Sequence, residues 1–114
     1  MRVEIDVFGN KIYCRENDDI HREDGPAIEY ANGDKDWCID GYIHREDGPA
    51  RECVNGYKEW RITGKRHRED GPAREYSDGR KEWYLDDIKY SEQEFDKIIL
   101  KYKWNKFVKD HQCV

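Results

Sequence analysis

Hydrophobic and polar positions alternate over short stretches of this chain, which is the period of β-strands rather than of helices. Val3, Ile5 and Val7 alternate in this way, and residues 11–16 would form the returning strand. Similar runs flank Asn32-Gly33, Asn55-Gly56 and Asp78-Gly79. An Asn-Gly or Asp-Gly pair between alternating runs is the strongest short-range signal of a β-hairpin. The pattern therefore predicts a series of antiparallel hairpins.

The hairpin signals recur with a period of 23 residues. The heptapeptide His-Arg-Glu-Asp-Gly-Pro-Ala occupies residues 21–27, 44–50 and 67–73, and a tryptophan follows four residues after each hairpin glycine. Such self-similarity is typical of repeat proteins, in which each unit buries its apolar side against its neighbours. Residues 1–20 align as a degenerate first unit and are expected to form a cap. In this alignment Gly9-Asn10 matches Asn32-Gly33, and Cys14 takes the position of the tryptophans.

A two-residue type I′ turn at Asn32-Gly33 would set the register of the second unit. Ile28 would then lie opposite Trp37 and Glu29 opposite Asp36, although a one-residue bulge would change these partners. Because side chains alternate between the faces of a strand, each face can be written out. One face would carry Ile28, Tyr30, Trp37 and Ile39, and the other Glu29, Asp36, Cys38 and Asp40.

The third and fourth units would follow the same register. Arg51 and Arg74 replace Ile28, so each guanidinium would lie against the tryptophan opposite it. On the other face like charges would oppose each other, which is unfavourable across a ladder. A cation between them, such as an arginine of a neighbouring repeat, would relieve the repulsion. The pairs concerned are Glu52 with Glu59 and Glu75 with Glu82.

The pattern changes to a helical one after residue 90. Ser91 and Glu94 form a capping box, in which Ser91 is the N-cap and Glu94 the third helical residue. Two apolar stripes follow, and the first is expected to cover the end of the sheet, while the second folds back after a kink or forms a contact surface. The first stripe comprises Phe95, Ile98, Ile99 and Tyr102, and the second Leu100, Trp104, Phe107 and Val108.

The expected fold is therefore mainly β: an array of about four consecutive antiparallel β-hairpins with a 23-residue repeat, capped by a C-terminal α-helix. The repeat domain would span residues 1–90, with units of about 1–20, 21–43, 44–66 and 67–90. Residues 91–114 would form an amphipathic capping helix and a frayed tail that contains His111 and Cys113. At 36% hydrophobic and 41% charged residues the core must be thin, and its 13% aromatic residues supply most of it.

The charge balance bounds the partners. Lys and Arg number 21 against 26 Asp and Glu, a net charge of −5, so direct binding to nucleic acid or to an anionic membrane is not expected. The four cysteines form no Cys-x-x-Cys pair or disulfide-framework spacing, and Cys14 and Cys53 are interpreted as small buried residues. Without a signal peptide or a long apolar span, the chain is expected to be soluble and cytoplasmic.

The repeated polar residues resemble a reactive site, but their regular spacing favours a structural role. A catalytic or metal site needs one converging constellation, whereas these groups recur one strand pair apart. Each His is expected to bond a turn carbonyl or to pack on a Trp edge, and each Arg to pair with a carboxylate across repeats. We expect no catalytic residue, cofactor or metal. The predicted structural set is His21, Arg22, Asp24, Gly25, Pro26, Trp37, His44, Arg45, Asp47, Gly48, Pro49, Trp60, His67, Arg68, Asp70, Gly71, Pro72 and Trp83.

The pattern Gly-x-x-His-Arg-x-Asp-Gly-Pro-Ala, followed by Asn/Asp-Gly and Trp, resembles the MORN-repeat-variant proteins of phages, large DNA viruses and bacteria, some of which are labelled as antitoxins. The resemblance covers about residues 1–100. It implies a β-hairpin array that binds other proteins, and it carries no catalytic residue. The charged connector departs from ordinary MORN repeats, so phosphoinositide binding is not implied.

These observations predict a non-enzymatic protein-binding module. With the resemblance, the expected role is that of a viral or phage accessory protein that binds and inhibits a host defence protein, possessing a basic nucleic-acid groove, through an acidic face. The alternatives are an antitoxin or immunity partner, and a structural homo-oligomer formed through the C-terminal helix. The residues expected to bind the partner are Glu29, Asp36, Asp40, Glu52, Glu59, Glu75, Glu82, Trp104 and Phe107.

Overall fold

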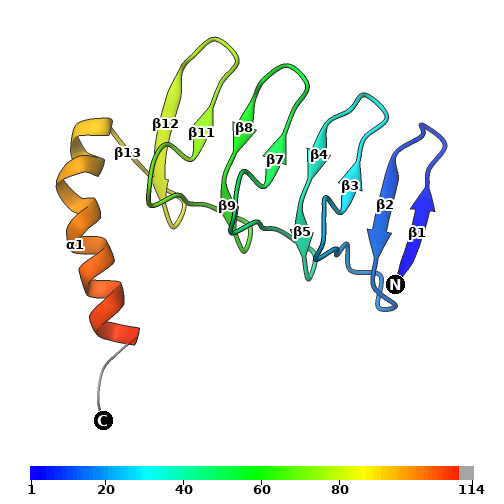
Figure 1. The fold of residues 1–114 in the computed structure, drawn as a ribbon, viewed down its shortest axis with the longest axis horizontal. Coiled ribbons are helices and arrows are strands. Elements are labelled where there is room, and N and C mark those ends of the chain that lie inside the picture. The colour runs from blue at the N-terminus through cyan, green and yellow to red at the C-terminus, as the bar shows by residue number, and fades with distance from the viewer. Residues whose placement is uncertain (111–114) are drawn as a thin grey trace.

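The structure, a computed structural model, describes residues 1–110 and is mainly β with one C-terminal helix. Nine strands form one antiparallel sheet in the order β1-β2-β3-β4-β7-β8-β11-β12-β13. The described part is a slab of 47 × 44 × 18 Å, with β1 at one end and helix α1 (Glu92–Asp110) beyond β13 at the other (Figure 1). The predicted fold class is confirmed. The tail predicted at residues 111–114 lies outside the described residues.

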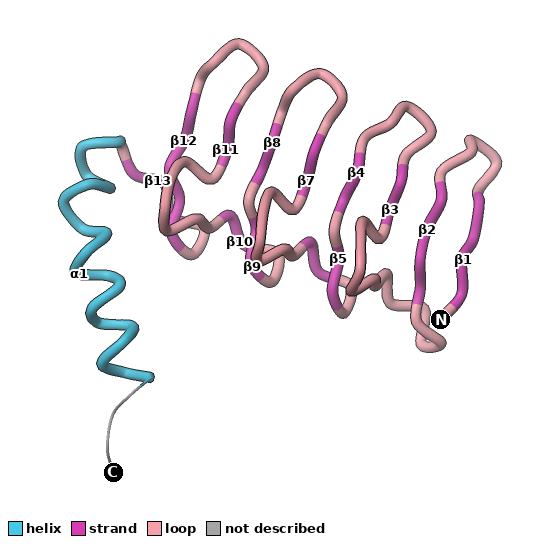
Figure 2. The backbone as a smooth tube through the Cα atoms, viewed as in Figure 1, coloured by secondary structure: helices cyan, strands magenta, loops and turns pink. Residues whose placement is uncertain are grey.

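Four long hairpins build the sheet, one for each predicted unit. Their tips lie at one end of the slab, and shorter hairpins lie at the opposite end (Figure 2). The paired strands are β1 (Arg2–Ile5) with β2 (Lys11–Cys14), β3 (Ile28–Glu29) with β4 (Lys35–Asp36), β7 (Arg51–Glu52) with β8 (Lys58–Glu59), and β11 (Arg74–Glu75) with β12 (Lys81–Leu85).

Three short hairpins, which the sequence analysis did not predict, follow the tryptophan positions. Each turns through two residues of positive φ, as in a type I′ turn: Asp40-Gly41, Thr63-Gly64 and Asp86-Asp87. Asp40-Gly41 and Thr63-Gly64 had been interpreted only as bends. The strands are β5 (Cys38–Ile39) with β6 (Tyr42–Ile43), β9 (Arg61–Ile62) with β10 (Lys65–Arg66), and β12 with β13 (Ile88–Tyr90).

The predicted register of the long hairpins is wrong by one residue. Ile28 pairs with Asp36 and Glu29 with Lys35, instead of with Trp37 and Asp36. Gly33 alone has a positive φ, of 98°, and donates its N–H to the Tyr30 carbonyl at 2.9 Å. The loop is therefore a turn followed by a bulge at the glycine, the alternative that had been left open. The Asn32 side chain accepts the Asp34 N–H at 3.0 Å, which accounts for the Asn or Asp before each hairpin glycine.

The first unit is offset by 24 residues rather than 23. Tyr13, not Cys14, takes the place of Trp37, because the Tyr13 carbonyl accepts the His21 N–H at 2.9 Å as the Trp37 carbonyl accepts that of His44 at 2.9 Å. The assignment of Cys14 to the tryptophan position is therefore wrong. Cys14 is nevertheless buried, as predicted.

The core is thin and is built around small residues. Ala27, Ala50 and Ala73, the last residues of the three heptapeptides, are completely buried. The Ala50 N–H bonds the Glu59 carbonyl at 2.8 Å, and its carbonyl accepts the Trp37 N–H at 2.8 Å. Each alanine thus joins one long hairpin to the next, at a place where a larger side chain has no room.

Helix α1 begins as predicted, since the Ser91 hydroxyl accepts the Glu94 N–H at 3.2 Å and the Glu94 carboxylate accepts the Ser91 N–H at 2.8 Å. Phe95 of the first stripe is buried, and the helix contacts β12 and β13. The second stripe is exposed on a single continuous helix, so its predicted fold-back after a kink is wrong.

Candidate functional site

The predicted acidic face is divided between the two sides of the sheet. With the bulged register, Glu29, Glu52 and Glu75 alternate with lysines on one side, in a row we call the lysine–glutamate row. Asp36, Glu59 and Glu82 alternate with arginines on the other, in the arginine–carboxylate row. The first row runs Lys11, Glu29, Lys35, Glu52, Lys58, Glu75, Lys81. The second runs Ile12, Ile28, Asp36, Arg51, Glu59, Arg74, Glu82.

The prediction of opposed like charges is therefore wrong, because Glu52 faces Lys58 and Glu59 faces Arg51 and Arg74. A one-residue slip moves every side chain of a strand to the other face, so the bulge converts predicted repulsion into two rows of alternating charge. Asp40 lies in neither row. It belongs to a short hairpin turn, where its carboxylate pairs with Arg15.

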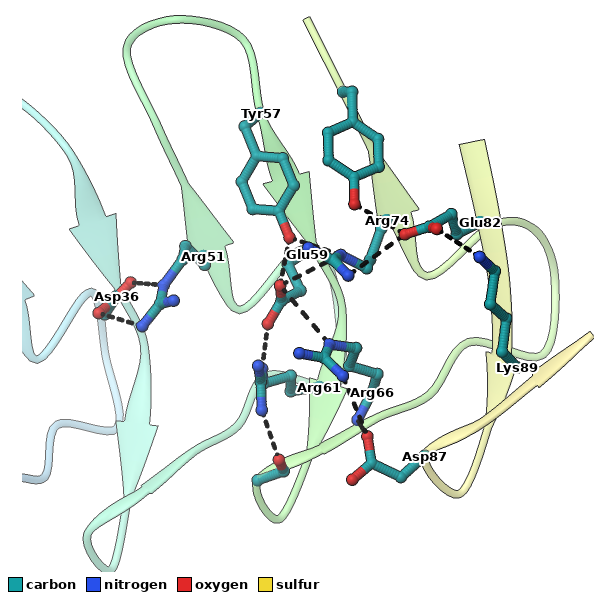
Figure 3. A network of polar contacts seen from close by, with 12 residues as sticks. Asp36, Arg51, Tyr57, Glu59, Arg61, Arg66, Arg74, Glu82, Asp87 and Lys89 are labelled. Atoms are coloured by element: carbon teal, nitrogen blue, oxygen red, sulfur yellow. Dashed lines mark hydrogen bonds and ion pairs between the residues drawn. The ribbon is translucent and has the colours of Figure 1, made fainter. Parts of the chain in front are cut away.

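The arginine–carboxylate row is a buried ionic network (Figure 3). Arg51 holds Asp36 with two hydrogen bonds, of 2.8 and 3.2 Å. Glu59 accepts hydrogen bonds from Tyr57 and Arg61, and the Arg74 Nε lies 3.7 Å from its carboxylate. Asp36 and Glu59 are both buried, so neither can serve as the accessible acidic contact that the sequence predicted.

Tyrosine hydroxyls complete the network from two different positions. Tyr30 donates to Asp36 at 2.8 Å and Tyr76 donates to Glu82 at 2.7 Å. Cys53 occupies the equivalent position in the third unit, as predicted, and Tyr57 on the opposite arm of that hairpin supplies the hydroxyl to Glu59. Each buried carboxylate thus has a phenol partner, which satisfies an oxygen that would otherwise be costly to bury.

These contacts predict a stability that falls in acid. Burial opposes ionisation of Glu59, but hydrogen bonds from Tyr57 and Arg61 outweigh it, so its pKa lies below the ordinary 4.5. Bonds from Lys89 and Tyr76 likewise lower the pKa of Glu82. Because the unfolded chain then binds more protons, the free energy of unfolding should be fully present above pH 4.5 and fall as the pH drops through the lower folded values.

Urea titrations at a series of acidic pH values measure this effect. The midpoint should decrease steadily below about pH 4.5. Glu82→Gln should flatten the dependence, since one of the titrating carboxyl groups is then absent. A midpoint that rose on acidification would contradict the assigned direction.

The three heptapeptides share one internal structure. In each, the Arg Nε donates to the Asp two residues later, at 2.9, 2.9 and 3.0 Å, and the Arg Nη1 donates to the Pro carbonyl, at 3.2, 3.1 and 3.0 Å. The prediction that these arginines pair with carboxylates across repeats is wrong. A Cβ on Gly48 would lie 3.0 Å from the Arg45 guanidinium carbon, so the glycine permits this close approach.

The arginine of each heptapeptide also stacks on the aromatic ring of the preceding unit. Arg22, Arg45 and Arg68 place their guanidinium carbons 4.0, 4.0 and 3.9 Å from the rings of Tyr13, Trp37 and Trp60. The sequence had assigned this role to Arg51 and Arg74, which instead face carboxylates. Trp83, in the last unit, lies opposite Tyr90 on β13.

The histidines bond to the short hairpins. The Nδ1 atoms of His21, His44 and His67 accept the N–H groups of Asp40, Thr63 and Asp86, at 2.9, 2.8 and 3.0 Å. The acceptor role requires a neutral ring with its proton on Nε2. The predicted partner, a turn carbonyl, is therefore wrong. Each imidazole bonds its own turn, and no cluster of three metal-ligating side chains is found among residues 1–110.

Two grooves lie between successive heptapeptides. Groove 1, of about 750 Å³, is lined by residues 22–26 and 44–47 with Trp37 and Ile39. Groove 2, of about 720 Å³, is lined by residues 45–48 and 67–70 with Trp60, Ile62, Lys103 and Lys106. Their charged side chains sum to −2 in groove 1 and to zero in groove 2, where the two lysines of α1 supply the difference. The sequence analysis did not single out these acidic residues.

Helix α1 itself covers part of groove 2. The Lys106 ammonium donates to Glu69 at 3.0 Å, and the Tyr102 ring lies 5.8 Å from that of His67. As a result the Glu69 side chain is 25% exposed, whereas that of Glu46, its equivalent in groove 1, is 83% exposed. Trp104 and Phe107, predicted to bind a partner, stack on each other at 6.0 Å and are exposed on the outer face of α1.

The cysteines show no sign of reactivity. Cys14, Cys38 and Cys53 are unpaired thiols. Burial raises the pKa of the Cys38 thiol to about 11 and also raises that of Cys53, so neither thiolate is present in quantity at neutral pH. Cys113 lies outside the described residues.

Comparisons with known proteins yield no match to a family model, a curated protein or a solved structure. The resemblance to MORN-repeat-variant proteins thus rests on the repeated motif and stays a prediction. In the part of the chain that the structure describes, no helix is long and apolar enough to cross a membrane.

Proposed function

We propose that this chain is a non-enzymatic binding module that holds a basic segment of another protein in groove 1. The observation that carries the proposal is the difference between the two grooves. Groove 2 receives two lysines from the chain's own helix, one of them on Glu69, whereas groove 1 has the same walls and keeps a net charge of −2. Complementary charge at such a surface speeds association and selects the partner.

The contact in groove 2 indicates the chemistry of the partner. A lysine reaches the heptapeptide glutamate while an aromatic ring one helical turn earlier lies beside the histidine. Glu46, Glu23 and the indole of Trp37 offer equivalent contacts in groove 1. The proposed ligand is therefore a lysine- or arginine-bearing segment with an aromatic side chain, since cations and rings both find partners there.

The motif resemblance extends this proposal to biology. If the chain is a viral or phage accessory protein, its partner is a basic host protein, and binding inhibits that protein by occupying a surface meant for nucleic acid. An antitoxin-like pairing uses the same chemistry with a basic toxin. Unpaired thiols suit a reducing compartment such as the cytoplasm.

Charge reversal in groove 1 tests the proposal. In Glu23→Lys/Glu46→Lys, affinity for an octalysine peptide carrying one tryptophan-free fluorophore should fall by at least about tenfold, because two favourable contacts become repulsive. The binding isotherm is measured by fluorescence anisotropy, and the affinity of the unmodified chain should decrease with added salt.

The matched control is Glu16→Lys/Asp96→Lys, which changes the net charge equally at exposed residues outside both grooves. It should lose much less affinity. Equal losses in the two variants would mean that the peptide senses only total charge, and the proposed site in groove 1 would be abandoned.

A further inference from the structure

The two ends of the sheet are finished differently. At one end α1 lies beyond β13 and contacts both β12 and β13 (Figure 1). At the other end β1 is the outermost strand and, among the described strands, pairs only with β2. An open edge presents unpaired N–H and C=O groups that can accept another strand. Repeat arrays ordinarily need a polar cap at each end.

The backbone groups on the open edge belong to Val3 and Ile5. Tyr13 donates its N–H away from β1, to the Ala27 carbonyl at 2.8 Å. Val3 is the cross-strand partner of Tyr13, so it belongs to a pair without mutual hydrogen bonds, and its own N–H and C=O point outward. By the alternation of an antiparallel ladder, those of Ile5 point outward as well.

The side chains at this edge are apolar where a terminal cap would be polar. Val3 is 48% exposed and Ile5 71%, and both lie on the same face of β1. Arg2 and Glu4 occupy the other face, where the Arg2 Nε donates to Glu4 at 2.8 Å. The strand thus combines an apolar row with one positive and one negative charge.

We propose that β1 pairs with β1 of a second copy of this chain, antiparallel about a two-fold axis at Val3, so that two nine-stranded sheets become continuous. This interface lies at the sheet edge, away from groove 1, and is independent of the binding function proposed above. Isologous pairing of this kind closes the open edge of both copies at once.

The charges on β1 select this register. Pairing outward-facing residues with each other leaves three registers within residues 1–5. Val3 opposite Ile5 would place the two Glu4 side chains against each other, and Val3 opposite Met1 would do the same with Arg2. With Val3 opposite Val3, Arg2 of each copy faces Glu4 of the other, and Ile5 faces Met1, so both the charged and the apolar pairs are favourable.

Because five residues make a small interface, the dimer should be in equilibrium with the monomer, and its mass should depend on concentration. Sedimentation equilibrium from about 10 µM to about 1 mM should show a rise toward twice the monomer mass. A chain that stays monomeric over this range would overturn the proposal.

A charge swap tests the register. Arg2→Glu alone and Glu4→Arg alone each create two like-charge pairs across the axis, and each should raise the dissociation constant by at least about tenfold. The double variant Arg2→Glu/Glu4→Arg restores opposite charges in this register and should return the constant to within about threefold of the original. A dimer insensitive to the single changes would overturn the register.

Two further variants locate the interface. Val3→Pro removes an outward-facing N–H from an edge strand, a position where proline is tolerated, so the monomer should fold while the dimer is lost. Trp104→Glu changes the exposed stripe of α1 and should leave the dimer intact. Loss of the dimer in Trp104→Glu, with retention in Val3→Pro, would assign the contact to the helix instead.

Discussion

Replacing Glu59 with glutamine should lower the free energy of unfolding by about 3 kcal/mol, because removing one member of a buried ionic group leaves the other charges uncompensated. The Glu59 side chain is 3% exposed and is the shared partner of Arg61 and Arg74. Arg66 lies 3.9 Å away, and its buried Nε has no hydrogen-bond partner, so Glu59 is the closest balancing charge for that group as well. Urea unfolding followed by tryptophan fluorescence measures the change.

Glu52→Gln is the matched control on the opposite face of the same hairpin. Its side chain is 37% exposed, and the Arg45 Nη1 lies 3.6 Å from its carboxylate. An ion pair of this exposure contributes little, so the loss should be below about 1 kcal/mol. If both substitutions cost the same, the network around Glu59 does not have the role in stability assigned to it.

The fold was predictable because two independent signals agree. The 23-residue period fixes the number of long hairpins, and the Asn-Gly and Asp-Gly pairs fix their tips. The capping box at Ser91 fixes the start of the helix. These signals are local, so they survive without knowledge of tertiary packing.

The faces of the sheet were not predictable from the same signals. A two-residue turn and a bulged turn at Asn32-Gly33 are both compatible with the residues, and they differ by the one-residue slip that exchanges the faces. Alternating charge contains the missing information: only the bulged register places Lys35 beside Glu29 and Glu52. Comparing the charge pairs of both registers would have favoured the observed one.

The first unit shows why an alignment by turns alone can fail. Its loop is one residue out of step with the others, so counting back 23 residues reaches Cys14 instead of Tyr13. The physical requirement is an aromatic ring for Arg22 to stack on, and Tyr13 is the residue that supplies it. The turn at Asp86-Asp87 was missed for a related reason, because two aspartates adopt positive φ where the other units have glycine.

Docking of the C-terminal helix depends on one buried side chain, and Phe95→Ala should remove about 3 kcal/mol from the free energy of unfolding. Phe95 is 5% exposed, in the first turn of α1, while the more distant anchors, Tyr102 with Asp86 and Lys106 with Glu69, are surface contacts. A 19-residue helix is marginal in water without packing, so α1 should also lose hydrogen-exchange protection and part of its circular dichroism signal.

Phe107→Ala makes the same chemical change on the same helix, at a residue that is 51% exposed. Alanine improves helix propensity equally in both variants, so their difference isolates the packing of Phe95 against the sheet. The Phe107 variant should lose less than about 1 kcal/mol and keep its exchange protection. Equal losses, or a protected helix in Phe95→Ala, would show that α1 is held by its surface contacts, and the lysines in groove 2 would then be the main attachment of the helix to the repeats.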